Sequence, residues 1–240
     1  MAQKINPISF RLGTTQVWNS TLQIYGKSFK NYFSIVNNQL NLQNFIIRYV
    51  KLNGFQINYY EWKMHKNKTF LSIYFSPSFN NGKLNLTNFK QLSNLLSNWC
   101  SNKFIFHFYL NSKWSLTSNF LTLYTKYLVE QKLGPKKIIV ILCNFLQDQL
   151  NSSKVMHFKF GFIETKLVGF KIRLVGRFDS SNQMAKSFDQ TIGTLSLTNL
   201  SSFVEYSNIE IHTKLGTCGV QVWLFFTPKK FINGYNQKNS

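Results

Sequence analysis

The chain has 240 residues and a formal net charge of +20, from 28 Lys and Arg against 8 Asp and Glu. Its apolar share of 44% and aromatic share of 17% exclude a mainly disordered protein, because burial of such a chain offsets its ordering entropy. The charge predicts a polyanionic partner, with RNA or DNA the commonest, and an anionic membrane is the weaker alternative because no single amphipathic helix gathers the basic residues.

The first 26 residues have no clear periodicity and contain Pro7, Gly13 and Gly26, which predicts an extended basic arm. Helical spacing begins at Asn41, which can cap the helix, and Asn53 and Gly54 can end it. The apolar positions on one face of this predicted helix are Leu42, Phe45, Ile46, Tyr49 and Val50.

Two aromatic and β-branched runs, 55–63 and 69–75, flank a polar segment and predict a hairpin with a basic tip. A helix capped by Thr87 follows, and then a third strand over 103–110. The helix face consists of Phe89, Leu92, Leu96 and Trp99. This order of elements predicts a compact α/β module.

The second half predicts a helical hairpin followed by strands. One helix carries its apolar face over 120–128, Gly134 and Pro135 break the chain, and a second helix runs through Leu150. A short helix is expected at 184–188 and a turn at 216–219. The expected strands are 155–164, 167–178, 203–214 and 220–226.

The residue types and their spacing do not indicate a catalytic site, so we predict that the protein is not an enzyme and has no catalytic residue. Glu205 and Glu210 are five positions apart on a strand and therefore point to opposite faces, which favours solvated or Lys-paired carboxylates over a catalytic pair. His212 and Cys218 lack further nearby ligands, so we expect no metal site and no cofactor. A nuclease, which would need clustered acids, is the least favoured alternative.

Targeting signals and membrane spans are not expected either. The first residues resemble neither a signal peptide nor a transit peptide, and the longest apolar run, 138–143, is far shorter than the roughly 20 residues of a membrane span. Three distant cysteines indicate reduced thiols and not a disulfide framework.

Basic residues form three groups with aromatic neighbours: Lys63, Lys66 and Lys68 on the hairpin; Lys132, Lys136 and Lys137 around the helical break; and Lys171, Arg173 and Arg177 on one strand. The strand group has no acid near it in sequence until Asp179, whereas a solvated sheet face normally mixes both signs. We therefore predict that this stripe binds phosphate.

Two stretches of the chain carry recognisable motifs. The first is the opening Gln3-Lys4-Ile5-Asn6-Pro7 with Arg11-Leu12-Gly13, Trp18 and Ser20. The second consists, in order, of Gly169-Phe170-Lys171-Ile172-Arg173, Gly176-Arg177-Phe178, Ala185-Lys186, Gly193, Leu197, Glu205-Tyr206, Thr213, Gly216 and Gly219-Val220-Gln221-Val222-Trp223. The first resembles the opening, and the second the carboxy-terminal domain, of the universal small-subunit ribosomal protein S three family.

The resemblance implies an α/β (α+β) protein with a type II KH domain followed by a second two-layer α/β domain. We expect an arm over 1–26, the KH-like domain over 27–112, the second domain over 113–228 and a tail over 229–240. The Gly-x-x-Gly loop of the family is degenerate here, because Asn81, Gly82 and Lys83 supply a single glycine.

The resemblance also implies a structural constituent of the small ribosomal subunit that binds rRNA in the head and lines the mRNA entrance. Its expected partners are small-subunit rRNA, mRNA and neighbouring head proteins, with no membrane and no homo-oligomer. The residues expected to bind rRNA are Lys4, Arg11, Lys171, Arg173, Arg177 and Lys186. Lys132, Lys136 and Lys137 are expected to face mRNA.

The composition also bears on the compartment. Basic charge comes from 24 Lys and only 4 Arg, and Ala occurs twice, which indicates an AT-rich genome. With the degenerate loop, this favours a mitochondrial version, and a plastid version is the alternative. The alternative function is a stand-alone KH-type organellar RNA-binding factor in splicing or mRNA regulation.

Overall fold

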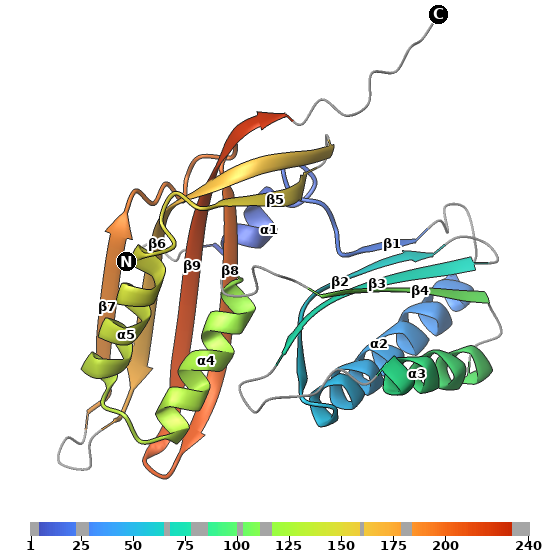
Figure 1. The fold of residues 1–240 in the computed structure, drawn as a ribbon, viewed down its shortest axis with the longest axis horizontal. Coiled ribbons are helices and arrows are strands. Elements are labelled where there is room, and N and C mark those ends of the chain that lie inside the picture. Colours follow the sequence, from blue (N-terminus) through green and yellow to red (C-terminus); the bar gives the residue numbers. More distant parts are fainter. Residues whose placement is uncertain are drawn as a thin grey trace, which may run out of the picture. The chain divides into compact units, whose positions relative to one another are not determined.

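A computed structural model describes residues 5–22, 29–64, 68–77, 86–99, 103–110, 117–158, 161–178 and 184–231. The chain divides into two compact units, residues 18–114 and residues 1–17 together with 115–240. Each unit packs helices against a β-sheet (Figure 1), which confirms the mixed α/β class. The four-part division expected from the sequence stays a prediction.

The unit of residues 18–114 has a four-stranded sheet in the order β1-β2-β3-β4. β2 and β3 are antiparallel, as the predicted hairpin requires, whereas β1 pairs parallel to β2 and β4 parallel to β3. Its elements are β1 (Ser20–Leu22), α2 (Phe29–Leu52), β2 (Phe55–Met64), β3 (Lys68–Pro77), α3 (Leu86–Trp99) and β4 (Lys103–Leu110).

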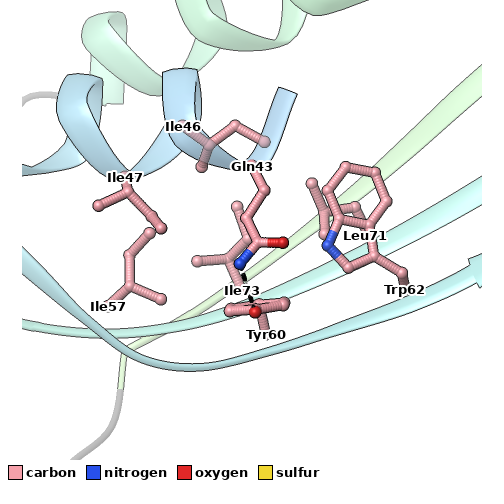
Figure 2. Close-up of a pocket in the computed structure, with 8 residues that line it drawn as sticks. All are labelled: Gln43, Ile46, Ile47, Ile57, Tyr60, Trp62, Leu71 and Ile73. Atoms are coloured by element: carbon pink, nitrogen blue, oxygen red, sulfur yellow. Dashed lines mark hydrogen bonds between the residues drawn. The ribbon is translucent and has the colours of Figure 1, made fainter. Parts of the chain in front are cut away.

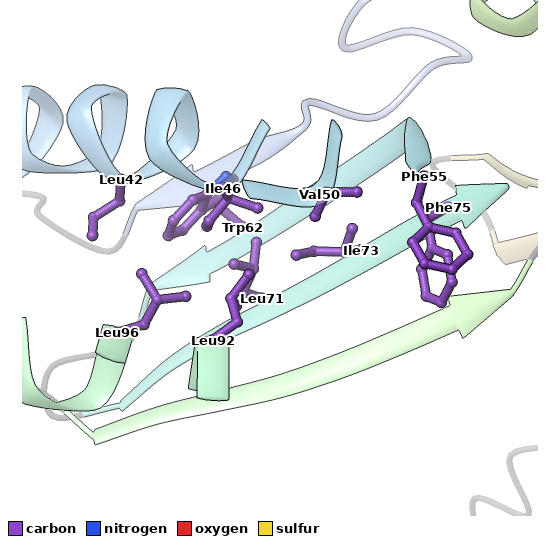
Figure 3. Packing of buried hydrophobic residues seen from close by; sticks show 10 residues of the cluster. All are labelled: Leu42, Ile46, Val50, Phe55, Trp62, Leu71, Ile73, Phe75, Leu92 and Leu96. Atoms are coloured by element: carbon purple, nitrogen blue, oxygen red, sulfur yellow. The ribbon is translucent and has the colours of Figure 1, made fainter. Parts of the chain in front are cut away.

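Two helices close the core of this unit against one face of the sheet. Ile46 and Val50 of α2 and Leu92 of α3 point toward Trp62, Leu71 and Ile73 (Figure 3). The prediction that the first helix begins at Asn41 is wrong, because α2 begins at Phe29. Phe33 and Leu40 are exposed, so this stretch shows no core-facing apolar period from which a helix could be predicted.

The second unit contains a five-stranded antiparallel sheet in the order β5-β6-β9-β8, with β7 paired to β6. The two long helices contact this sheet, α4 mainly over β8 and β9 and α5 over β6 and β7. Its elements are α1 (Pro7–Arg11), α4 (Ser118–Glu130), α5 (Pro135–Gln147), β5 (Ser153–Phe158), β6 (Gly161–Gly176), β7 (Lys186–Gly193), β8 (Phe203–Thr213) and β9 (Gly216–Phe231).

Three local predictions in this unit are wrong. The single strand expected over 155–164 is divided between β5, which ends at Phe158, and β6, which begins at Gly161 and runs antiparallel to β5. The short helix expected at 184–188 does not form, because residues 186–193 are strand β7, whose pairing with β6 along its whole length outweighs the weak helical tendency of one or two turns. The expected turn at 216–219 is already part of β9, and the chain reverses at residues 214–215 instead. Strand pairing decides these cases: β5 and β7 with β6, and β9 with β8 across the tight reversal.

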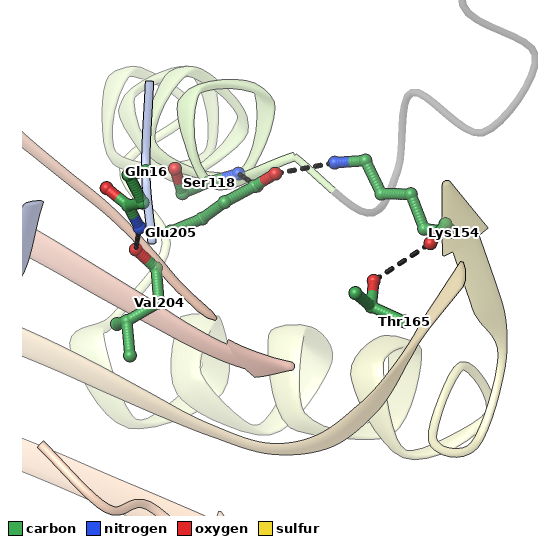
Figure 4. A network of polar contacts seen from close by, with 6 residues as sticks. All are labelled: Gln16, Ser118, Lys154, Thr165, Val204 and Glu205. Atoms are coloured by element: carbon green, nitrogen blue, oxygen red, sulfur yellow. Dashed lines mark hydrogen bonds and ion pairs between the residues drawn. The ribbon is translucent and has the colours of Figure 1, made fainter. Parts of the chain in front are cut away.

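The expected extended arm begins with a short helix. Asn6 caps α1 by accepting from the backbone N–H of Ile8 at 2.9 Å, and Pro7 occupies the first turn. Gln16 donates to the backbone oxygen of Val204 at 3.0 Å (Figure 4), so this segment lies against β8. The first part of the arm therefore packs on the second unit and is not an extended strand.

Candidate nucleic-acid interface

The lysine cluster Lys132, Lys136 and Lys137 lies at the break between α4 and α5. All three side chains are exposed, and Lys132 has a φ of 59°, a left-handed conformation in which the chain reverses between the two helices. Lys136 and Lys137 fall in the first turn of α5, which has no acidic residue. Cations at this end oppose the helix dipole, so these two lysines do not stabilise α5 and suit an anionic partner instead.

The strand stripe is less cationic than its sequence indicates. Asp189 of β7 stands directly opposite Arg173 of β6, and its carboxylate lies 3.3 Å from Arg173 Nε and 3.5 Å from Lys171 Nζ. The premise that no acid accompanies the stripe is therefore wrong. The acid comes from a paired strand and not from the same segment. Two cations share one carboxylate, so a net positive charge remains.

Aromatic side chains lie beside this stripe. Lys171 is paired with Trp223 of β9, and its Nζ lies 5.7 Å from the centre of the indole ring. The ring of Tyr206 in β8 lies next to Trp223, with 5.2 Å between the ring centroids. Arg177 follows the end of β6 and is partly buried, while Lys186 is exposed at the start of β7. The result is a mixed aromatic and basic surface of the kind that contacts nucleic acid.

Arg11 is in a different position from the one expected of an rRNA-binding residue. Its side chain is fully buried, and its guanidinium donates to the backbone oxygens of Ser202 at 2.9 Å and Asn199 at 2.8 Å. It also donates to the oxygens of Pro7 and Leu197. Burial lowers the pKa of Arg11, but an arginine stays charged at neutral pH. A guanidinium enclosed in this way has no surface to offer a phosphate, so Arg11 acts within the protein.

Other predicted positions cannot be placed. Lys4 and the degenerate loop residues Asn81, Gly82 and Lys83 lie outside the described residues. Lys66 of the expected hairpin tip is also outside them, whereas Lys63 and Lys68 are exposed.

Glu205 has a structural role that its sequence position did not reveal. Its carboxylate accepts from Lys154 Nζ at 2.7 Å and from the backbone N–H of Ser118 at 3.2 Å (Figure 4). Thr117, the N-cap residue of α4, makes no side-chain capping bond, so a carboxylate from β8 serves this helix end. The prediction of a Lys-paired carboxylate is confirmed for Glu205. Glu210 is exposed.

The described residues offer few groups for metal binding or catalysis. Among the described residues no three His, Cys, Asp or Glu side chains lie close enough to hold a metal ion. Cys143 and Cys218 are buried free thiols, and burial raises the pKa of Cys143. None of the described helices is long and apolar enough to span a membrane.

One small cavity lies between α2 and its sheet (Figure 2). Its volume of about 10 Å³ is at the lower limit for one water molecule. Gln43 donates to the hydroxyl of Tyr60 at its rim, and burial raises the pKa of that phenol. The cavity is therefore a packing defect and not a ligand site.

Comparison with known proteins relates the chain to one family. No protein-family model matches it. The small ribosomal subunit protein uS3 of Pelagibacter ubique is 24% identical over 230 residues, which cover 94% of this chain and 90% of the relative. The protein uS3c of Epifagus virginiana is 25% identical over 232 residues, 94% of this chain and 98% of its own length. These similarities support the uS3 family for this chain.

A shorter match supports the same family: uS3 of Borreliella afzelii is 39% identical over 57 residues, 24% of this chain. These relatives are named as proteins of the small ribosomal subunit, which supports the prediction that the chain is not an enzyme. The described basic side chains outside the core are therefore candidates for binding and not for catalysis.

Proposed function

We propose that this uS3-family chain is a structural constituent of the small ribosomal subunit that binds rRNA in the head and lines the mRNA entrance. The observation that carries the proposal is the similarity to uS3 proteins along 94% of the chain. The net charge of +20 supports it, because a chain with few acids needs a polyanion to relieve its self-repulsion.

The unit of residues 18–114 serves in this proposal as a type II KH domain. Its helix, hairpin, helix and strand follow the order expected of such a domain. Because the glycine loop of the family is degenerate, we assign this unit mainly to structure and protein docking and not to gripping a single strand.

The contact with mRNA is assigned to Lys132, Lys136 and Lys137. Their exposure, and the position of two of them at a helix N-terminus, form a concentrated positive site for a phosphate backbone.

The contact with rRNA is assigned to Lys171, Arg173, Arg177 and Lys186, with Lys4 retained from the sequence. The shared carboxylate of Asp189 orients Lys171 and Arg173 without neutralising both. Arg11 is removed from this set because of its burial.

The proposed location is an organellar ribosome. The AT-rich composition favours the mitochondrion, whereas the plastid alternative gains support from relatives of the chloroplast form uS3c. Identification of the genome that encodes the chain decides between them.

Sedimentation tests the proposed function. Organelle lysate is fractionated at moderate salt with magnesium, and the protein is expected to sediment with small subunits. A pool that runs free of subunits would overturn the proposal in favour of a stand-alone RNA-binding factor. The control is the same lysate treated with EDTA, in which the protein should shift together with the subunit rRNA.

A further inference from the structure

Strand β4 has an outer edge without the features by which proteins usually block strand pairing. It is the last strand of its sheet in the described part of the chain, and its register with β3 runs unbroken from Lys103 to Leu110. Edge strands are commonly protected by shortness, bulges, proline or charge. β4 has eight residues, no proline and no bulge, and Lys103 at its start is its one Lys, Arg, Asp or Glu residue.

The other sheet edges of the described residues show the contrast. β1, at the opposite edge of the same sheet, has only three residues. β7 in the second unit has eight residues, as β4 has, but carries Lys186 and Asp189. The edge strands β5 and β8 of the same sheet carry Lys154 and the pair Glu205 and Glu210. Charge or shortness thus limits pairing at these edges, whereas β4 has one charged residue, at its start.

The side chains at the end of β4 add to this surface. Tyr109 is 44% exposed and Leu110 is 53% exposed. Tyr109 stacks on Tyr74 of β3, with 4.9 Å between the ring centroids and 17° between the ring planes. The ring of Tyr74 in turn lies 5.8 Å, centroid to centroid, from the ring of Tyr59 in β2. This cross-strand row of rings ends at the β4 edge, where another strand could continue it.

We propose that the β4 edge accepts an extended segment of a second protein as an added strand. Main-chain N–H and C=O groups would pair along the edge, and an apolar or aromatic residue of the partner would pack on Tyr109. The proposal rests on the proposed function in one respect, namely that the partner is a neighbouring protein of the small subunit.

The charge of this unit and the chemistry of a strand edge together specify an acidic protein segment as the occupant. Residues 18–114 contain eleven Lys and Arg and one Glu, so acidic side chains on the partner would be attracted. This charge would attract RNA as well. RNA, however, lacks the regular backbone N–H and C=O groups that pair along a strand edge, so the edge favours a protein segment.

Photo-crosslinking in the full chain tests the proposal. The photoreactive residue p-benzoylphenylalanine is placed at Tyr109, or for control at Leu95, which is 51% exposed on α3 of the same unit. In small subunits we expect the Tyr109 probe to form an adduct with one protein, mapped to an extended acid-bearing segment, in roughly fivefold excess over the Leu95 probe. Leu110→Lys should abolish this excess, whereas Leu95→Lys should preserve it.

Several outcomes would overturn the strand addition: an adduct with RNA, an adduct with a second copy of the chain, or no excess adduct in subunits that contain the protein. Circular dichroism of the Leu110→Lys variant checks that the chain is folded. If the protein stays outside small subunits, the proposed function fails, and irradiation of the particle-free pool then decides by the same adducts whether β4 binds a protein strand.

Discussion

Arg11 places its charge inside the protein, where carbonyl oxygens surround it. The arginine belongs to α1, and the oxygens of Leu197, Asn199 and Ser202 that it bonds lie more than 180 positions along the chain. Such bonds from a charged donor are stronger than those between neutral groups, and five N–H donors in one plane serve several carbonyls at once. The residue therefore fastens the N-terminal helix to the loop before β8.

Replacement of Arg11 should destabilise the protein without changing its RNA contacts. For Arg11→Met we expect the free energy of unfolding to fall by about 3 kcal/mol, because several buried carbonyls lose their donor. Arg11→Lys should restore little of this, since an ammonium cannot reach the same set of oxygens. Urea denaturation measures the change, with Arg48→Met at an exposed helical position as the control. Unchanged stability with a weaker salt dependence of RNA binding would instead place Arg11 on RNA.

At the scale of elements, helix α4 begins at a cap supplied from another strand. Glu205 of β8 joins the first N–H of α4 to Lys154 of β5, so one carboxylate links three elements. Thr165 of β6 donates to the backbone oxygen of Lys154 at 2.8 Å, which adds a side-chain bond to the pairing of β5 with β6. These contacts hold the start of α4 on its sheet.

Loss of the Glu205 charge should weaken this connection. Glu205→Gln is expected to lower the free energy of unfolding by about 1–2 kcal/mol, because a charged acceptor at a helix N-terminus becomes neutral. Glu210→Gln, on the same strand but exposed, is the matched control and should change stability by less than about 0.5 kcal/mol. Thermal unfolding measures both. In a Lys154→Met background the effect of Glu205→Gln should shrink, and equal effects in both backgrounds would contradict the ion pair.

At the scale of the whole molecule, the positive charge divides into cations held by acids, cations enclosed by carbonyls and cations open to solvent. Lys171 and Arg173 belong to the first group, Arg11 to the second and the cluster at Lys132 to the third. Only the exposed and partly exposed groups can contribute to nucleic-acid binding, so net charge alone overstates the number of phosphate contacts.

The two basic clusters should separate by function. Replacement of Lys132, Lys136 and Lys137 with Gln is expected to preserve incorporation into small subunits and to impair translation of structured mRNAs. Replacement of Lys171, Arg173 and Arg177 with Gln should impair rRNA binding. It should also reduce the slope of the logarithm of the binding constant against the logarithm of the salt concentration by roughly one unit for each lost phosphate contact. Filter binding over a salt series and sedimentation measure these effects. As a control, Asp189→Asn should strengthen rRNA binding, and an assembly defect in the first triple variant would place that cluster on rRNA.

Much of the fold follows from local patterns. The strand over 103–110 and the start of α5 at Pro135 agree with the sequence prediction, because an aromatic-rich run and a proline in the first helical turn are local signals. The candidate site was only partly predictable. The exposure of Lys136 and Lys137 was expected, but the strand stripe was expected to have no acid near it before Asp179, whereas Asp189 of the paired strand lies beside it.

The sequence by itself determined the basic charge that favours a polyanionic partner, most of the α/β order from periodicity, and the resemblance to the uS3 family from motifs at both ends. Only the tertiary structure decided which charges are available. Arg11 is enclosed by a loop distant in the chain, Asp189 meets Arg173 through strand register, and residues 186–193 become a strand by pairing with β6. Periodicity reports how one segment is buried, whereas these outcomes depend on which distant segment it meets.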